Sequence, residues 1–311
     1  MFKYYGEATR NEHRITRFGR GFPFLHPDYS GDLFVLCKHS SDYYEAFIFS
    51  TEDDINAFLD AYGMSPVDVG KLITSTPIIE ARIAHQIDVF IAGLTEEFPS
   101  SNSMSDMARQ IFASSFKDLP HTPDDLVVGY TQIEYQIFQR LEQVRYSGYL
   151  GSGFASLDEF INVANTVLNR RKSRAGKSLE NHLSAIFSSH SLSFEEQART
   201  EGNKRLDFLF PSAASYHDKT FPDSNLVSLA AKTTCKDRWR QILNEANRID
   251  VKHLFTLQQS ISSAQIAEMI EERVVLIVPS SNINTFAVQT RNQIWTLSNF
   301  IDFIKEKQGI Q

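Results

Sequence analysis

Residues 206–236 read LDFLFPSAASYHDKTFPDSNLVSLAAKTTCK, and this stretch decides the fold. Residues 206–210 form a short run of β-favouring apolar residues that ends at Pro211. Residues 226–233 form a second apolar run of strand length. Runs that are apolar without alternation are typical of strands covered on both faces. The stretch therefore predicts two buried strands of one sheet.

Helices and strands alternate on either side of this pair. Apolar residues recur at helical spacing over 179–187, and a helix is predicted at 237–249. Further strands are predicted at 254–257 and 274–278. Strands interleaved with helices predict an α/β domain with a mixed sheet flanked by helices.

The first part of the chain is β-rich. Strands are predicted at 33–36 and 46–49, followed by a helix that opens at Thr51, has an acidic first turn and ends at Gly63. Two strands and one helix are too few to close a barrel, so this part looks incomplete.

A helical segment lies between the two β-containing parts. Helices are predicted at 104–116, 130–144 and 157–168, with a glycine-rich break at 148–153. The loop at 99–103 is the best boundary, and 66–94 shows no clear pattern. We expect the chain to divide into residues 1–84, a linker at 85–99 and a domain at 100–311, the last with a helical part (100–168) and an α/β core (169–311).

The overall composition is that of a globular protein. The 311 residues are 42% hydrophobic and 22% charged, with a net charge of −7. The two cysteines, Cys37 and Cys235, exclude a disulfide framework and a zinc module as organising principles. No apolar run is long enough to span a bilayer and no secretory signal is present. We expect a soluble protein of a reducing compartment such as the cytoplasm, with no membrane partner.

Two basic runs stand out against the acidic background. Residues 1–20 carry five Lys or Arg residues against two acids, and residues 170–177 read RRKSRAGK without an acid. A solvated helix face is the ordinary explanation of one such run. Two runs favour contact with a polyanion, of which duplex DNA is the commonest.

The predicted strand pair also carries a candidate catalytic site. Metal-dependent phosphodiester hydrolysis needs carboxylates to hold a hard cation and a lysine near the attacked phosphate. Asp207 and Lys232 lie on the two strands that could provide them, although Ala230 occupies the place of a second acid. Glu245, on the following predicted helix, and Glu180, on the preceding one, could supply the missing carboxylates. Singly, such residues are more often caps or strand exits.

Residues 236–238, Lys-Asp-Arg, follow the second strand. Lysine and arginine donate to guanine O6 and N7, and aspartate accepts from cytosine N4, so Lys236, Asp237 and Arg238 are candidates for reading C:G pairs. The alternative is that Asp237 caps a helix and Arg238 is solvated.

Several stretches that contain these residues resemble a known protein family. Residues 170–180 (RRKSRAGKSLE), 200–204 (TEGNK) and 232–245 closely resemble the catalytic domain of EcoRII-type restriction endonucleases, and the likeness extends over about 130–311. Residues 9–21 (TRNEHRITRFGRG) resemble part of that family's N-terminal DNA-binding pseudobarrel.

The resemblance implies a type II endonuclease with a restriction-endonuclease-like core that cuts duplex DNA at CCWGG, using Mg²⁺ and acting as a homodimer. It implies active-site roles for Glu180, Asp207, Lys232 and Glu245, the three acids holding the metal. It also matches Tyr216 to a tyrosine once proposed to be catalytic, which we rank below the others because metal-and-water chemistry needs no covalent tyrosine. The implied DNA-binding residues are Lys236, Asp237, Arg238, the basic run Arg170, Arg171, Lys172, Arg174 and Lys177, and the N-terminal arm Arg10, Glu12, His13, Arg14 and Arg17.

Two departures qualify the resemblance. Leu206 replaces the usual proline before the metal-binding Asp207, and the chain begins partway through the N-terminal effector pseudobarrel. We therefore expect weaker effector binding and weaker autoinhibition. An active enzyme implies a companion DNA methyltransferase, whereas the alternative function is a non-cleaving, sequence-specific DNA-binding protein.

Overall fold

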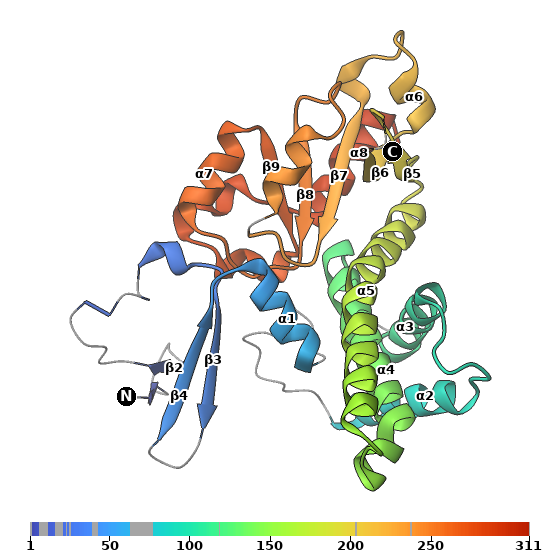
Figure 1. Cartoon of the computed structure of the whole chain (residues 1–311). Helices are drawn as coiled ribbons and strands as arrows, with labels where there is room; N and C mark the ends of the chain where they lie inside the picture. Colours follow the sequence, from blue (N-terminus) through green and yellow to red (C-terminus); the bar gives the residue numbers. More distant parts are fainter. Residues whose placement is uncertain are drawn as a thin grey trace.

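The computed structural model describes residues 2–5, 12–15, 21–22, 24, 26–38, 43–62, 77–117, 119–202, 204–236 and 238–310. They form a β-hairpin with one helix, a group of long helices, and a sheet flanked by helices (Figure 1). Within these described residues, no helix combines the length and apolar character needed to cross a membrane.

A mixed six-stranded sheet dominates the C-terminal half, in the order β10-β9-β8-β7-β6-β5. β7 to β10 run parallel, whereas β5 and β6 run antiparallel to their neighbours. The strands are β5 (Glu195–Arg199), β6 (Arg205–Phe210), β7 (Val227–Lys232), β8 (Lys252–Thr256), β9 (Val274–Val278) and β10 (Trp295–Thr296). This confirms the predicted mixed sheet and the four predicted strands. β5, which reads EEQAR, and the two-residue β10 lack the apolar run that marks a strand in sequence.

Helices cover both faces of the sheet. Leu229 of β7 packs with α5 (Leu157–Ser189) and α8 (Leu297–Gln308), whereas its neighbour Ala230 packs with α7 (Ser263–Glu271). Successive strand residues point to opposite faces. Burial on both sides therefore explains why β7 reads as a continuous apolar run, and α6 (Ala213–His217) lies beside β5 at the edge.

The helical group contains α2 (Pro77–Ala92), α3 (Ser101–Ser115) and α4 (Pro123–Ser152), which share an apolar core. Residues 85–92 of the segment expected to be a linker belong to α2, whose Ile87 and Ile91 are buried in this core. The unpatterned stretch 66–94 thus contains a helix in its described part.

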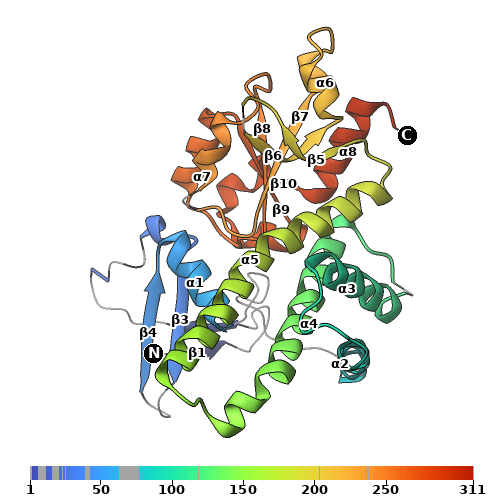
Figure 2. The same ribbon diagram turned by 45° about the vertical axis from the view of Figure 1, so that its right-hand side comes forward.

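The helices predicted at 157–168 and 179–187 form one continuous helix. α5 is continuous over Leu157–Ser189 and runs from the tip of the helical group to the sheet (Figure 2). The glycine-rich break is also shorter than expected, because α4 continues through Gly148 and Gly151 and ends at Gly153, whose φ of 74° suits glycine. Tertiary packing of α4 against α3 and α5 outweighs the roughly 1 kcal/mol that each helical glycine costs.

The N-terminal part contains two antiparallel strand pairs. β1 (Phe2–Tyr5) pairs with β2 (Glu12–Ile15), and β3 (Leu33–Lys38) pairs with β4 (Tyr44–Phe49). α1 (Glu52–Tyr62) packs on β3 through Ile55 and Leu59 and lies against α5 (Figures 1 and 2). The predicted strands and helix of this part are confirmed.

Candidate active site

Asp207 and Lys232 meet where β6 and β7 pair. The Lys232 Nζ donates to the Asp207 Oδ2 at 3.0 Å, and the main-chain N–H of Ala231 donates to the same oxygen at 2.8 Å. Both side chains are partly buried. The two residues that the sequence singled out are therefore in direct contact.

The register of the two strands shows where a second acid on β7 would lie. Phe208 pairs with Leu229, so continuing the antiparallel register places Ala230 opposite Asp207. An acid at 230 would lie directly across from Asp207, on the face that also carries Lys232. Alanine at that position leaves the site dependent on carboxylates from other elements.

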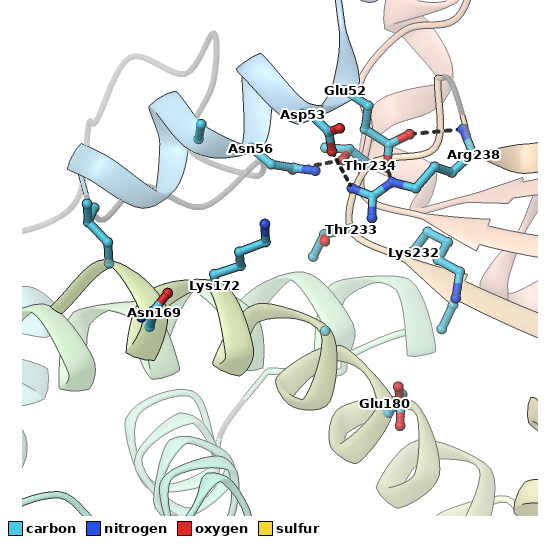
Figure 3. Close-up of a pocket in the computed structure, with 14 residues that line it drawn as sticks. Glu52, Asp53, Asn56, Asn169, Lys172, Glu180, Lys232, Thr233, Thr234 and Arg238 are labelled. Atoms are coloured by element: carbon cyan, nitrogen blue, oxygen red, sulfur yellow. Dashed lines mark hydrogen bonds and ion pairs between the residues drawn. The ribbon is translucent and has the colours of Figure 1, made fainter. Parts of the chain in front are cut away.

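Glu180 reaches the site from α5. Its Oε2 accepts hydrogen bonds from Lys177 Nζ at 3.3 Å and from Gln197 Nε2 at 3.1 Å. Burial and, second, the negative charge of Asp207 raise the pKa of Glu180, while Lys177 and Lys232 act in the opposite direction. Glu180 and Lys232 line the same cleft, and both are labelled in Figure 3.

Glu245 reaches the site on a loop rather than on the predicted helix 237–249. The segment Trp239–Asn244 forms a 3-10 helix (η5), after which Glu245 is extended (φ −97°, ψ 147°) and Ala246 is left-handed (φ 49°). Burial of Trp239 and Ile242 three residues apart is compatible with either helix type, so the apolar pattern could not separate them. Burial and the charge of Asp207 raise the pKa of Glu245, and Lys232 lowers it.

Carboxylate oxygens are the ligands that a hard divalent cation prefers, and burial and Asp207 raise the pKa of both Glu180 and Glu245. Among the described residues, no group of three or more His, Cys, Asp or Glu side chains is spaced to hold a metal by itself. Mg²⁺ needs no such cage, since it commonly uses one or two carboxylates together with phosphate oxygens and water. The repulsion that Asp207 exerts on Glu180 and Glu245 is the kind that a bound cation offsets.

Tyr216 is buried, and its hydroxyl is hydrogen-bonded within the chain. Its hydroxyl donates to Glu201 and accepts from the main-chain N–H of Arg248 at 3.2 Å. Burial and the Glu201 hydrogen bond raise the pKa of Tyr216 to about 12. A buried phenol that stays protonated at neutral pH is a poor nucleophile.

A cleft of about 450 Å³ adjoins the site between α1, α5 and the end of β7 (Figure 3). The polar residues that line it are Glu52, Asp53 and Asn56 from α1, Asn169, Lys172 and Glu180 from α5, and Lys232, Thr233, Thr234 and Arg238 from β7 and the segment after it.

The cations predicted to read bases are held by carboxylates of the N-terminal part. Arg238 Nε lies 3.0 Å from Glu52 Oε1, and the Arg238 main-chain N–H donates to Glu52 Oε2 at 3.2 Å (Figure 3). Lys236 Nζ pairs with Asp32 in a largely buried contact. Asp237 lies outside the described residues. In this structure Lys236 and Arg238 are therefore engaged within the chain.

Three arginines of the basic run, which the resemblance implied to be DNA contacts, turn into the helical group, where each has a partner within the chain. Arg174 is 4% exposed and pairs with the buried Glu134 at 3.0 Å. Arg171 pairs with Glu142 at 2.6 Å, and the Arg170 guanidinium stacks on a phenylalanine ring. A single helix face cannot carry every residue of a contiguous run, so part of the run must point inward.

The other two cations of the run remain at or near the cleft. Lys172 lines the cleft, and Lys177 is bound to Glu180. Of the N-terminal arm, Arg10 and Arg17 lie outside the described residues, and Glu12, His13 and Arg14 belong to β2.

Several residues near the site gave no signal in the sequence. Glu52 and Asp32 accept hydrogen bonds from residues that lie more than 180 positions away in the sequence. Gln197, Lys204 and Lys252 contact the carboxylates or the loop that carries Glu245. The sequence shows an acidic first turn at Glu52, but the favourable interaction of acids with the positive end of the helix dipole is a sufficient reason for it.

Comparisons with known proteins agree with this arrangement. The family described as "EcoRII C terminal" matches residues 138–301, and "Restriction endonuclease EcoRII, N-terminal" matches residues 1–68. The type II restriction enzyme EcoRII of Escherichia coli is 40% identical over 306 residues, covering 94% of this chain and 74% of the relative. The type II restriction enzyme SsoII of Shigella sonnei is 26% identical over 146 residues, 44% of this chain and 47% of that protein.

Solved structures agree on the fold. Metal-depleted Ecl18kI in complex with uncleaved, modified DNA has a TM-score of 0.54 at 18% identity, covering 72% of this chain and 84% of that one. The complex of the restriction endonuclease PspGI with substrate DNA has a TM-score of 0.54 at 14% identity, covering 69% and 95%. Together, the sheet, the Asp207–Lys232 pair and the likeness over nearly the whole chain establish that this protein belongs to the EcoRII family of type II restriction endonucleases.

Proposed function

We propose that the chain hydrolyses duplex DNA at CCWGG by means of Mg²⁺ and an activated water. The observation that carries the proposal is the contact between Asp207 and Lys232 on neighbouring strands, with Lys232 and Glu180 lining the same cleft. The recognition sequence follows from the resemblance to EcoRII-type enzymes.

The residues divide into metal-holding and phosphate-facing groups. Asp207 and Glu245 would hold the ion, with Glu180 assisting. Bound Mg²⁺ supplies a Lewis acid that polarises a phosphate oxygen and makes bound water more acidic. Lys232, fixed by Asp207, orients the attacking water and places positive charge where the phosphate becomes more negative.

Binding of DNA requires the N-terminal part to release residues 236–238, the recognition segment. Lys236 and Arg238 are paired with Asp32 and Glu52, so bases and phosphates compete with these carboxylates. Once free, Lys236, Asp237 and Arg238 would read the C:G pairs of the site. α1 thus acts as an inhibitory cover, whose strength depends on the ion pairs that it makes.

Two partners follow from the proposed activity. CCWGG is symmetric apart from its central pair, so two copies of the chain related by a two-fold axis can each read one half. A cell that contains the active enzyme also needs a methyltransferase that protects the same sites in its own DNA.

A cleavage assay with Lys232→Ala tests the proposal. The unmodified protein should cut a duplex containing CCWGG only when Mg²⁺ is present, and should leave a duplex with a scrambled site intact. Lys232→Ala should slow cutting by about 10²–10³-fold or more, because it removes a transition-state contact. Its binding to the same duplex in EDTA, measured by fluorescence anisotropy, should change by less than about threefold, or about 0.6 kcal/mol.

Two results would contradict the proposal. Site-specific binding by the unmodified protein without cutting would identify the chain as a non-cleaving DNA-binding protein. Equal loss of binding and cutting in Lys232→Ala would remove the catalytic role of that lysine.

A further inference from the structure

The loop that brings Glu245 to the site is held by two lysine side chains. Lys252 Nζ donates to the main-chain carbonyl of Ala246 at 2.5 Å and also to that of Ile249. Lys204 Nζ donates to the carbonyl of Asn244. The residues before and after Glu245 are therefore both tied to ammonium groups.

The position of Lys252 is costly for a purely structural residue. It begins β8, is 6% exposed, and burial lowers the pKa of its ammonium. Burying an ammonium costs several kcal/mol unless hydrogen bonds and opposite charges compensate. Glu201 and Glu245 are the two carboxylates that act most on it. Both carboxylates favour the charged form of Lys252, whose ammonium is bonded to main-chain carbonyls of the loop.

The backbone after Glu245 is strained and needs such support. Ala246 is fully buried and has a φ of 49°, a region that costs a non-glycine residue about 1–2 kcal/mol. This conformation turns the chain sharply after Glu245. Its carbonyl is the one that accepts from Lys252. Loss of that hydrogen bond would favour relaxation of the turn and movement of Glu245.

We propose that Lys252, assisted by Lys204, is a positioning residue that holds the 244–249 loop so that Glu245 faces Asp207 and Lys232. The inference rests on the proposed function, because it gives Glu245 a task at the metal. Lys252 is bonded to main-chain carbonyls of the loop, so we assign its effect to the loop.

A double-mutant cycle between Lys252→Met and Glu245→Gln tests the inference. Methionine keeps most of the length of the lysine stem and removes the ammonium. Single-turnover cleavage by Lys252→Met should be about 10–100-fold slower, since a displacement of about 1 Å at a reacting centre has an effect of that size. The Mg²⁺ concentration for half-maximal rate should rise, while binding of the duplex in EDTA should change by less than about threefold, or about 0.6 kcal/mol.

The double variant separates positioning from general damage. If Lys252 works through Glu245, the double variant should be no slower than Glu245→Gln alone, because coupled residues are non-additive. Lys204→Met, at a more exposed position, should show a smaller loss with the same non-additivity. Lys307→Met is the matched control, since Lys307 also donates to a main-chain carbonyl, that of Ser224 at 2.8 Å, and should cut at the unmodified rate.

The outcomes are distinct. Additive losses in the cycle, or an unchanged rate in Lys252→Met, would overturn the inference. Should Lys252→Met not fold, as judged by its thermal unfolding curve, the cycle of Lys204→Met with Glu245→Gln decides by the same criterion. If Glu245→Gln itself cuts at the unmodified rate, the failure lies in the proposed role of Glu245 and not in the loop.

Discussion

Replacement of Glu52 by glutamine should strengthen DNA binding by releasing Arg238. Glu52 is 2% exposed, its Oε1 lies 3.0 Å from Arg238 Nε in an ion pair, and it accepts hydrogen bonds from the Arg238 main-chain N–H at 3.2 Å and from Thr234 Oγ1 at 3.1 Å. Glutamine preserves the shape and removes the charge that holds the guanidinium.

The magnitude follows from the exposure of the pair. A hydrogen bond to a charged group contributes about 1.5–3 kcal/mol. The Arg238 side chain is 41% exposed, so solvent screening favours the lower end of that range. About 1.4 kcal/mol corresponds to a tenfold change, so Glu52→Gln should bind DNA about tenfold more tightly.

Asp53→Asn provides a control with the same change in net charge. Asp53 lies 3.7 Å from Arg238 and its side chain is 91% exposed, a geometry that contributes about 0–1 kcal/mol. Its gain in affinity should therefore be less than about threefold, or about 0.6 kcal/mol.

Fluorescence anisotropy of a labelled CCWGG duplex, without divalent metal and at one fixed salt concentration, measures both variants. Weaker or unchanged binding by Glu52→Gln would refute the competition between α1 and DNA. Equal gains in the two variants would attribute the effect to net charge alone.

The remaining predictions concern the carboxylate cluster, the basic run and the tyrosine. Burial and Asp207 raise the pKa of Glu180 in the folded state, so its ionisation destabilises the fold as pH rises through that pKa. Glu180→Gln should therefore raise the melting temperature at pH 7–8 by roughly 2–4 °C per kcal/mol recovered, with no gain near pH 4. An equal gain at both pH values would contradict the assignment. Arg174→Met should destabilise the protein by about 3–5 kcal/mol in denaturant unfolding, because it leaves Glu134 charged and buried. Lys172→Met should instead keep its stability and reduce the salt dependence of DNA binding by about one ion, and the reverse pattern would restore Arg174 as a DNA contact. Tyr216→Phe should cut DNA within about threefold of the unmodified rate while losing about 1–2 kcal/mol of stability, whereas a catalytic tyrosine would lose about 10³-fold or more.

Parts of the site could be predicted because their causes are local. A short apolar run with Asp207 near its start predicts a buried strand, and Lys232 at the end of the next run predicts its neighbour. Strand pairing then brings the two side chains within hydrogen-bonding distance. The roles of Glu180 and Glu245, implied by the resemblance, stay a prediction, whereas the helix expected at 237–249 was wrong, because the structure has only a 3-10 helix over Trp239–Asn244.

Other parts could not be predicted because they depend on which side of an element meets which neighbour. The run at 170–177 reads as one basic patch, but α5 rotates Arg174 into the helical group and Lys172 toward the cleft. A left-handed Ala246 and a buried Lys252 have no sequence signature, since neither residue type favours its environment.

The sequence by itself determined the alternation of strands and helices, the Asp207–Lys232 pair and the family, because each is encoded within short stretches by side-chain periodicity and residue type. Only the tertiary structure decided that Glu52 and Asp32 pair with Arg238 and Lys236 and that Lys252 bonds to the loop that carries Glu245. Lys236 and Asp32 are separated by 204 positions. A contact over such a distance arises when packed elements bring two charges together, and no local pattern in the chain records it.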